Sequence, residues 1–89
     1  MKALFPLGRV AATPGVIERI KESDIRSALD RHASGDWGDV CPEDFQTNQE
    51  ALQHGLRLLS VFTSSDGIRF WIITEADRSS TVVLLPDEY

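Results

Sequence analysis

Four acidic residues lie close together in the middle of this 89-residue chain, at Asp36, Asp39, Glu43 and Asp44, with His32 just before them. Carboxylates at such spacings can bind Mg²⁺ or Ca²⁺. The alternation of oxygen ligands that a calcium loop needs is missing, and the two histidines and one cysteine lack the paired spacing of zinc sites. We therefore expect a solvated acidic loop that caps a helix, with no bound metal and no other cofactor.

A second polar group, made of Glu75, Asp77 and Arg78, follows the strongest predicted strand. Functional side chains often lie at strand ends, where a rigid sheet positions them. Glu75 and Asp77 could form paired carboxylates for acid–base catalysis. The simpler interpretation is that Arg78 forms an ion pair that fixes the turn, or that the turn recognises a partner. The alternative is a small hydrolase or metal-dependent enzyme that uses these three residues.

Trp37, which lies between Gly35 and Gly38, has two interpretations. Its ring can fill the core, with the indole N–H bonded to a nearby carbonyl, or it can anchor an exposed interface. We favour the core. His32 falls on the apolar face of a predicted helix, so we expect a hydrogen-bonded core histidine rather than a ligand.

Nothing in the sequence matches a nucleophile elbow, a phosphate-binding loop or a dinucleotide-binding motif. The single cysteine, Cys41, permits no internal disulfide, which is typical of a reducing compartment. No apolar run approaches the ~20 residues of a membrane span, and residues 1–6 lack the apolar stretch of a signal peptide. We therefore expect a cytoplasmic protein without a membrane partner.

Nine basic and fourteen acidic residues give a net charge of −5, and no two Lys or Arg residues are adjacent. Nucleic-acid-binding proteins usually carry a basic stripe, so we expect no direct DNA or RNA binding. An acidic chain favours a protein partner with a basic surface. The candidate partner-binding residues are Asp36, Trp37, Asp39, Glu43, Asp44, Glu75, Asp77 and Arg78.

The elements that must position these residues begin with a short strand within residues 4–12. Thr13 can cap a helix that reaches Glu22, with Val16, Ile17 and Ile20 on its inner face. Ser23 can cap a second helix, which ends near Gly35. A third helix runs from Pro42 to Gly55, and its predicted inner residues are Phe45, Asn48, Ala51 and Leu52.

Strands are predicted at residues 56–63, 68–74 and 80–85, with a hairpin turn at Asp66-Gly67. Alternation places Trp71 on the face opposite Phe70 and Ile72. The order β-α-α-α-β-β-β predicts one α+β domain over residues 1–89. Its core is a three-stranded antiparallel meander with helices on one face, and the first strand can join at an edge.

Four segments carry a family resemblance: Gly35-Asp36-Trp37-Gly38-Asp39, Leu58-Leu59-Ser60, residues 71–79 (WIITEADRS) and residues 84–89 (LLPDEY). On these the chain resembles small bacterial proteins labelled "plasmid-related" or "type I restriction subunit M". The resemblance implies bacterial origin and association with mobile elements, and it implies no established activity. A DNA methyltransferase needs a larger cofactor domain and a Pro-Pro active-site motif, and this chain has neither.

We therefore expect a binding or regulatory protein rather than an enzyme. One regulatory role that the resemblance suggests is inhibition of a host defence system by a phage or plasmid protein. A structural subunit of a larger complex is a further alternative.

Overall fold

The computed structural model describes residues 3–89, so Met1 and Lys2, where the signal-peptide argument begins, lie outside it. The element order confirms the α+β prediction. The elements are β1 (Arg9–Ala12), α1 (Pro14–Arg19), α2 (Glu22–Ala33), α3 (Pro42–His54), β2 (Leu58–Thr63), β3 (Arg69–Thr74), β4 (Ser80–Leu84) and the 3-10 turn η1 (Pro86–Glu88).

The four strands form one sheet in the order β1-β4-β3-β2. Strands β2, β3 and β4 are the predicted antiparallel meander, and β1 joins β4 at the edge. Because β1 runs parallel to β4, the sheet is mixed rather than purely antiparallel. Gly67 has a φ of 83°, which lets the Asp66-Gly67 turn close the β2–β3 hairpin as predicted.

The helix boundaries agree with the sequence at α3 and at the start of α1, and differ at the end of α1 and the start of α2. The Thr13 hydroxyl accepts a hydrogen bond from the amide of Val16, as expected of a cap. The backbone becomes extended at Ile20, so α1 ends before Glu22. Helix α2 begins at Glu22, and Lys21 is its N-cap. Ser23 is therefore inside α2 and does not cap it.

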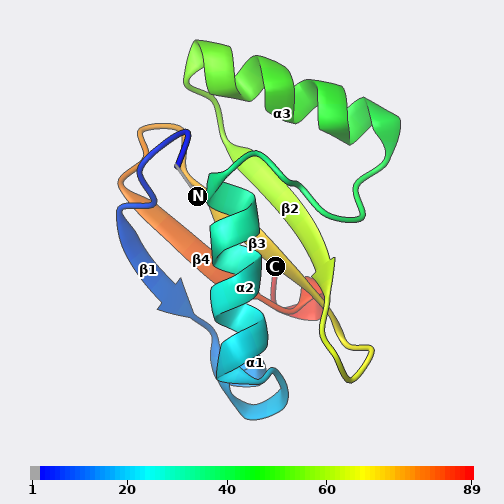
Figure 1. Ribbon diagram of the computed structural model, residues 1–89. Coiled ribbons are helices and arrows are strands. Elements are labelled where there is room, and N and C mark those ends of the chain that lie inside the picture. The colour runs from blue at the N-terminus through cyan, green and yellow to red at the C-terminus, as the bar shows by residue number, and fades with distance from the viewer. Residues whose placement is uncertain (1–2) are drawn as a thin grey trace.

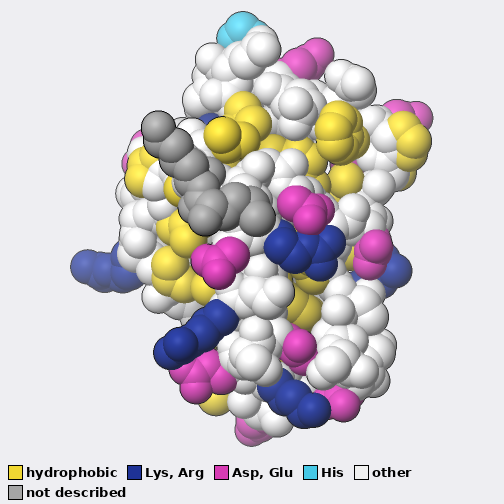
Figure 2. Space-filling model, viewed as in Figure 1, with side chains coloured by type: hydrophobic (Ala, Val, Ile, Leu, Met, Phe, Trp, Pro, Cys, Tyr) yellow, Lys and Arg dark blue, Asp and Glu magenta, His cyan; other side chains and the backbone are white. Residues whose placement is uncertain are grey.

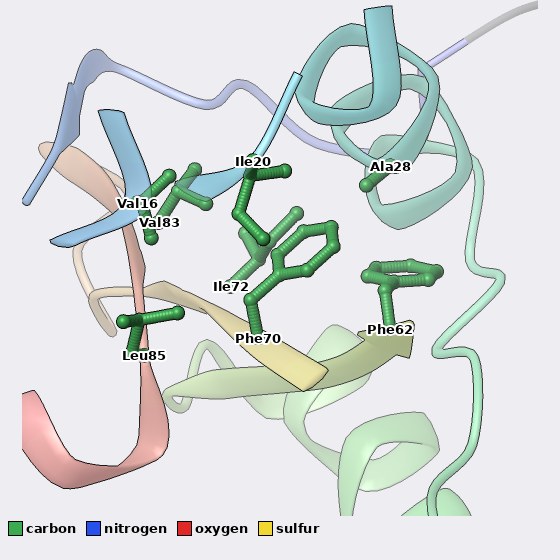
Figure 3. Packing of buried hydrophobic residues seen from close by; sticks show 8 residues of the cluster. All are labelled: Val16, Ile20, Ala28, Phe62, Phe70, Ile72, Val83 and Leu85. Atoms are coloured by element: carbon green, nitrogen blue, oxygen red, sulfur yellow. The ribbon is translucent and has the colours of Figure 1, made fainter. Parts of the chain in front are cut away.

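Helices α1 and α2 cover one face of the sheet (Figure 1). The main core cluster joins their apolar residues to those of the strands, as Figure 3 shows for Val16, Ile20, Ala28, Phe62, Phe70, Ile72, Val83 and Leu85. The prediction that Ile17 points inward is wrong, because its side chain is 66% exposed. A helix of six residues offers the sheet one narrow stripe, and Val16 and Ile20 occupy it.

Helix α3 lies beyond the β2 side of the sheet (Figure 1). It contributes Ala51 to a second cluster with Phe5, Trp37 and Leu58. Phe45, which was predicted to face inward, is 44% exposed. A helix that packs against an edge buries a narrower stripe than one that packs on a face, and here the buried residues are Asn48 and Ala51.

Side chains of the strands alternate between the helix-covered face and the opposite one. Phe70 and Ile72 point towards the helices, and Trp71 lies on the opposite side, as predicted. The apolar residues of that opposite side, here called the outer face, are Leu59, Val61, Trp71, Ile73, Val82 and Leu84, of which Val61, Ile73 and Leu84 are buried. Neither core cluster contains any of these six residues.

Candidate functional site

The acidic loop is held in shape by its own carboxylates. Asp36 pairs with Arg31 at 2.7 Å and accepts a hydrogen bond from the amide of Gly38 at 3.0 Å. The bond from Arg31 is the main reason that the pKa of Asp36 lies below its usual value. Asp39 accepts a hydrogen bond from the Thr63 hydroxyl at 3.2 Å. These contacts fit a loop whose charges serve the fold.

The other two acids of this group, Glu43 and Asp44, lie in the first turn of α3. Negative charge is favourable there because the N-terminus of a helix carries a partial positive charge. Across residues 3–89, no three His, Cys, Asp or Glu side chains come close enough together to hold a metal ion. Cys41 is exposed at the N-cap of α3.

Trp37 fills the core, because its side chain is 1% exposed. Its indole N–H donates to the side-chain oxygen of Gln49 at 3.0 Å, and its ring stacks on Phe5. The structure therefore places Trp37 in the core, which is the first of its two interpretations. The ring is not available as an exposed interface anchor in this fold.

The turn between β3 and β4 does not bring Glu75 and Asp77 into a shared site. Glu75 pairs with Arg57 at 3.3 Å, and Asp77 accepts a hydrogen bond from the amide of Ser79. Hydrogen bonds from Ser79 also lower the pKa of Asp77. Each carboxylate thus has a partner of its own, and the paired arrangement needed for acid–base catalysis is not formed.

Arg78 does not form the predicted ion pair. Its guanidinium donates instead to backbone carbonyls, at 2.6 Å to Leu56, 3.1 Å to Ala51 and 3.1 Å to Glu75. Ala51 and Leu56 flank the C-terminal end of α3, where the Ala51 carbonyl also accepts from the amides of Gly55 and Leu56. Arg78 adopts a φ of 62°, which is unusual for a residue other than glycine. This arginine therefore ties α3 to the sheet.

A chain of buried hydrogen bonds crosses the interior. His32 Nδ1 lies 2.5 Å from Ser60 Oγ, and His32 Nε2 lies 2.9 Å from Thr74 Oγ1. Thr74 Oγ1 lies 2.7 Å from Thr81 Oγ1, which donates to the Leu7 carbonyl at 2.7 Å. All four side chains are 0% exposed. The prediction of a hydrogen-bonded core histidine is confirmed.

The Leu7 carbonyl sets the direction of every bond in this chain, because a carbonyl only accepts. The Thr81 hydroxyl donates its one proton to the Leu7 carbonyl, so its oxygen accepts a hydrogen bond from the Thr74 hydroxyl. Thr74 must then accept from the Nε2–H of His32, which leaves Nδ1 to accept from the Ser60 hydroxyl. The network assigns one tautomer of the histidine and satisfies every member.

A serine that gives its proton to a histidine is an element of nucleophilic catalysis. Here Ser60 is fully buried, and the third member is Thr74 rather than a carboxylate. Burial, with a smaller contribution from the charge of Arg78, lowers the pKa of His32 to about 4. No substrate reaches this pair in the folded state, so the network acts on stability.

A hollow of about 260 Å³ lies between α2 and the β2–β3 hairpin. The charged residues in its walls already have partners within the fold. Asp24 accepts hydrogen bonds from the amide and hydroxyl of Ser65, and Arg31 lies 4.7 Å above the Phe62 ring besides pairing with Asp36. Pockets for small molecules are usually about 300–1,000 Å³ with free polar groups. This hollow does not match that description.

The free edge of β2 is closed by two segments. Asn48 donates to the Leu59 carbonyl and accepts from the Leu59 amide. The loop at Gly38 pairs with Val61, which donates to the Trp37 carbonyl and accepts from the Asp39 amide. Exposed strand edges are prone to pair with other chains, so this edge is protected.

The residues of the outer face are not among the site residues predicted from the sequence. The signal was the continuous apolar run at residues 70–73, which is typical of a strand covered on both faces. Strand β3 is indeed central in the sheet, and the helices cover only the Phe70 and Ile72 side. Across the outer face, Val61, Trp71 and Leu84 form one row, and Leu59, Ile73 and Val82 form the next.

No family model, curated protein or solved structure matches this chain. The resemblance drawn from the sequence therefore stays a prediction. None of the helices within residues 3–89 combines the length and the apolar character needed to cross a bilayer.

Proposed function

We propose that this protein acts by binding another protein through the outer face of its sheet. The supporting observation is a two-row apolar grid that belongs to neither core cluster. Its Leu59, Trp71 and Val82 are partly exposed, and the other three residues are buried. Tryptophan, tyrosine and arginine dominate the energetics of protein interfaces. Tyr89 packs edge-on against Trp71, and Arg57 donates to the Tyr89 hydroxyl at 3.2 Å, so this face carries all three residue types.

The candidate catalytic groups support binding rather than catalysis. Glu75, Asp77 and Arg78 each have structural partners, and the His32–Ser60 pair is sealed inside the core. The resemblance adds a bacterial, mobile-element setting. We therefore place the target among the cytoplasmic components of a phage, a plasmid or a host defence system, with inhibition of such a component as the simplest regulatory role.

Photo-crosslinking in the host cell tests this proposal. A photoreactive amino acid replaces Val82, on the outer face, and in a matched control it replaces the exposed Ile17 of α1. We expect a discrete crosslinked partner at position 82 and none at position 17. The partner must then form a saturable complex with the purified protein, and Trp71→Ser must weaken that complex while the protein stays folded. Equal crosslinking at both positions, or no complex from purified components, contradicts the proposal.

A further inference from the structure

The strands carry a charge bias opposite to that of the whole chain. The protein has fourteen acidic and nine basic residues, yet none of the acids lies within a strand. The charged strand residues are Arg9 and Arg69, and both are exposed. Within residues 3–89 neither arginine forms an ion pair.

Both arginines project on the outer face. Arg69 is two residues before Trp71, so their side chains share a side of β3. Arg9 pairs in register with Ser80, which is two residues before the outer-face residue Val82. The face thus carries Arg9 and Arg69 at opposite ends. Arg57 at a third corner is paired with Glu75, and Asp39 bonds to Thr63, the cross-strand partner of Arg69.

The helical side differs in this respect. Figure 2 shows acidic and basic side chains interspersed on the side of the molecule that α2 occupies. Several of them pair with each other there, including Arg31 with Asp36 and Arg26 with Glu22. Arg19 on the helical side also forms no ion pair within residues 3–89, so what sets the outer face apart is that Arg9 and Arg69 lie beside an apolar centre. That arrangement is complementary to a partner with negative charge around an apolar stripe.

The shape of the face indicates a helix. Tyr89 packs on Trp71 and covers only part of the outer face, and sheet faces in α+β proteins are normally covered by helices. Strand addition at the β2 edge is blocked by Asn48 and by the loop at Gly38. Along the strand direction, Arg69 and Arg9 are six residue positions apart, which corresponds to about 20 Å. An α-helix of about 13 residues has the same length.

We propose that the outer face binds an acidic amphipathic helix of a partner protein. This inference rests on the proposed function and specifies the chemistry of the partner. Apolar side chains of that helix pack on the partly exposed Leu59, Trp71 and Val82, and its carboxylates lie near Arg9 and Arg69. The expected partner surface is therefore acidic, in contrast to the basic surface that net charge alone favoured.

Two fluorescent peptides of about 14 residues test the inference on the full chain. They share one leucine stripe, and their polar positions are Glu in one peptide and Lys in the other. We expect the Glu peptide to bind the parent protein at least roughly tenfold more tightly than the Lys peptide, with an affinity that falls as salt rises. An oligothymidine strand serves as a third probe.

The double variant Arg9→Glu, Arg69→Glu reverses the charge of the outer face. The matched control is Arg19→Glu, Arg26→Glu, which makes the same change in net charge on the exposed helical side. We expect the first variant to lose binding of the Glu peptide by about tenfold or more and the control to keep it, with both variants melting near the parent temperature.

Three outcomes overturn the inference: no preference between the peptides, equal loss in both double variants, or binding of oligothymidine that Arg9→Glu, Arg69→Glu abolishes. The crosslinked complex of the proposed function is a separate readout. If that complex forms and survives the reversal of Arg9 and Arg69, the partner is not acidic and this inference fails while the proposed function stands. If no complex forms, the proposed function fails by its own test.

Discussion

Asn48 on α3 bonds to both backbone groups of Leu59, as a neighbouring strand would. Its Nδ2 donates to the Leu59 carbonyl at 2.7 Å, and its Oδ1 accepts from the Leu59 amide at 3.1 Å. Asn48 is buried, although asparagine is rarely found in the interior. One side chain therefore docks a helix and satisfies the edge of the sheet.

Replacing Asn48 with leucine should destabilise the protein and open the edge of β2. Two partly buried backbone groups of Leu59 lose their partners, which costs about 1–3 kcal/mol in unfolding free energy. Denaturant titration measures the loss, and sedimentation tests whether the exposed edge promotes self-association. Gln53→Leu, which removes an exposed amide from the same helix, is the control and should have little effect.

Removing the Thr81 hydroxyl should break the buried network at its directing end. In Thr81→Val, the Leu7 carbonyl loses its donor and Thr74 loses its acceptor, so the expected cost is about 1–3 kcal/mol. Thr63→Val is the same change at the exposed end of β2, where the hydrogen bond it removes, to Asp39, is open to solvent, so it should cost much less. Equal losses in the two variants would show that the network adds nothing.

The neutral state of His32 should make stability depend on pH. Its pKa is about 4 in the folded protein and 6.5 ordinarily, so between these values the unfolded chain binds more protons. The stabilisation is fully present above pH 6.5 and is lost as the pH falls towards 4, a loss of about 3 kcal/mol at most. Denaturation midpoints from pH 7.5 to 4 measure it.

The control for this pH series is His32→Gln, since carboxylates also titrate in acid. The variant is less stable at neutral pH, and its stability should fall less steeply between pH 6.5 and 4. Parallel curves for the variant and the parent would mean that His32 does not change its protonation on unfolding.

The two tryptophans should differ in what their removal costs. Trp37→Ala leaves a cavity in the second core cluster and should cost roughly 3–5 kcal/mol, enough to unfold so small a domain. Trp71→Ala, on the outer face, should cost less and leave the protein folded. Thermal melting followed by circular dichroism compares them, and similar melting temperatures for both variants would contradict the assignment of Trp37 to the core.

Arg78 should be hard to replace for two separate reasons, its carbonyl contacts and its positive φ. Arg78→Ala loses the contacts and keeps the strained backbone. Arg78→Gly loses the same contacts but relieves about 1 kcal/mol of strain, so it should be the more stable of the two. Denaturant midpoints decide, and an alanine variant as stable as the glycine variant would show that the backbone is unstrained.

The sequence by itself determined the class and order of the elements, because those depend on local rules. Thr13 before Pro14, Pro42 followed by acids, Gly55 after α3 and the Asp66-Gly67 turn all act within a few residues, and each has the predicted role in the structure. Side-chain alternation likewise separated Trp71 from Phe70 and Ile72.

Only the tertiary structure decided what the polar residues do, because their partners are far away in the chain. Arg78 bonds to Ala51, His32 to Ser60 and Thr74, and Asn48 to Leu59, across 11 to 42 residues. Its neighbours in the sequence predict that Arg78 pairs with the adjacent acids. Tertiary packing instead brings its guanidinium to the C-terminal end of α3. The placement of helices on one face of the sheet, which leaves the outer face bounded by arginines, is likewise a result of packing that no local spacing encodes.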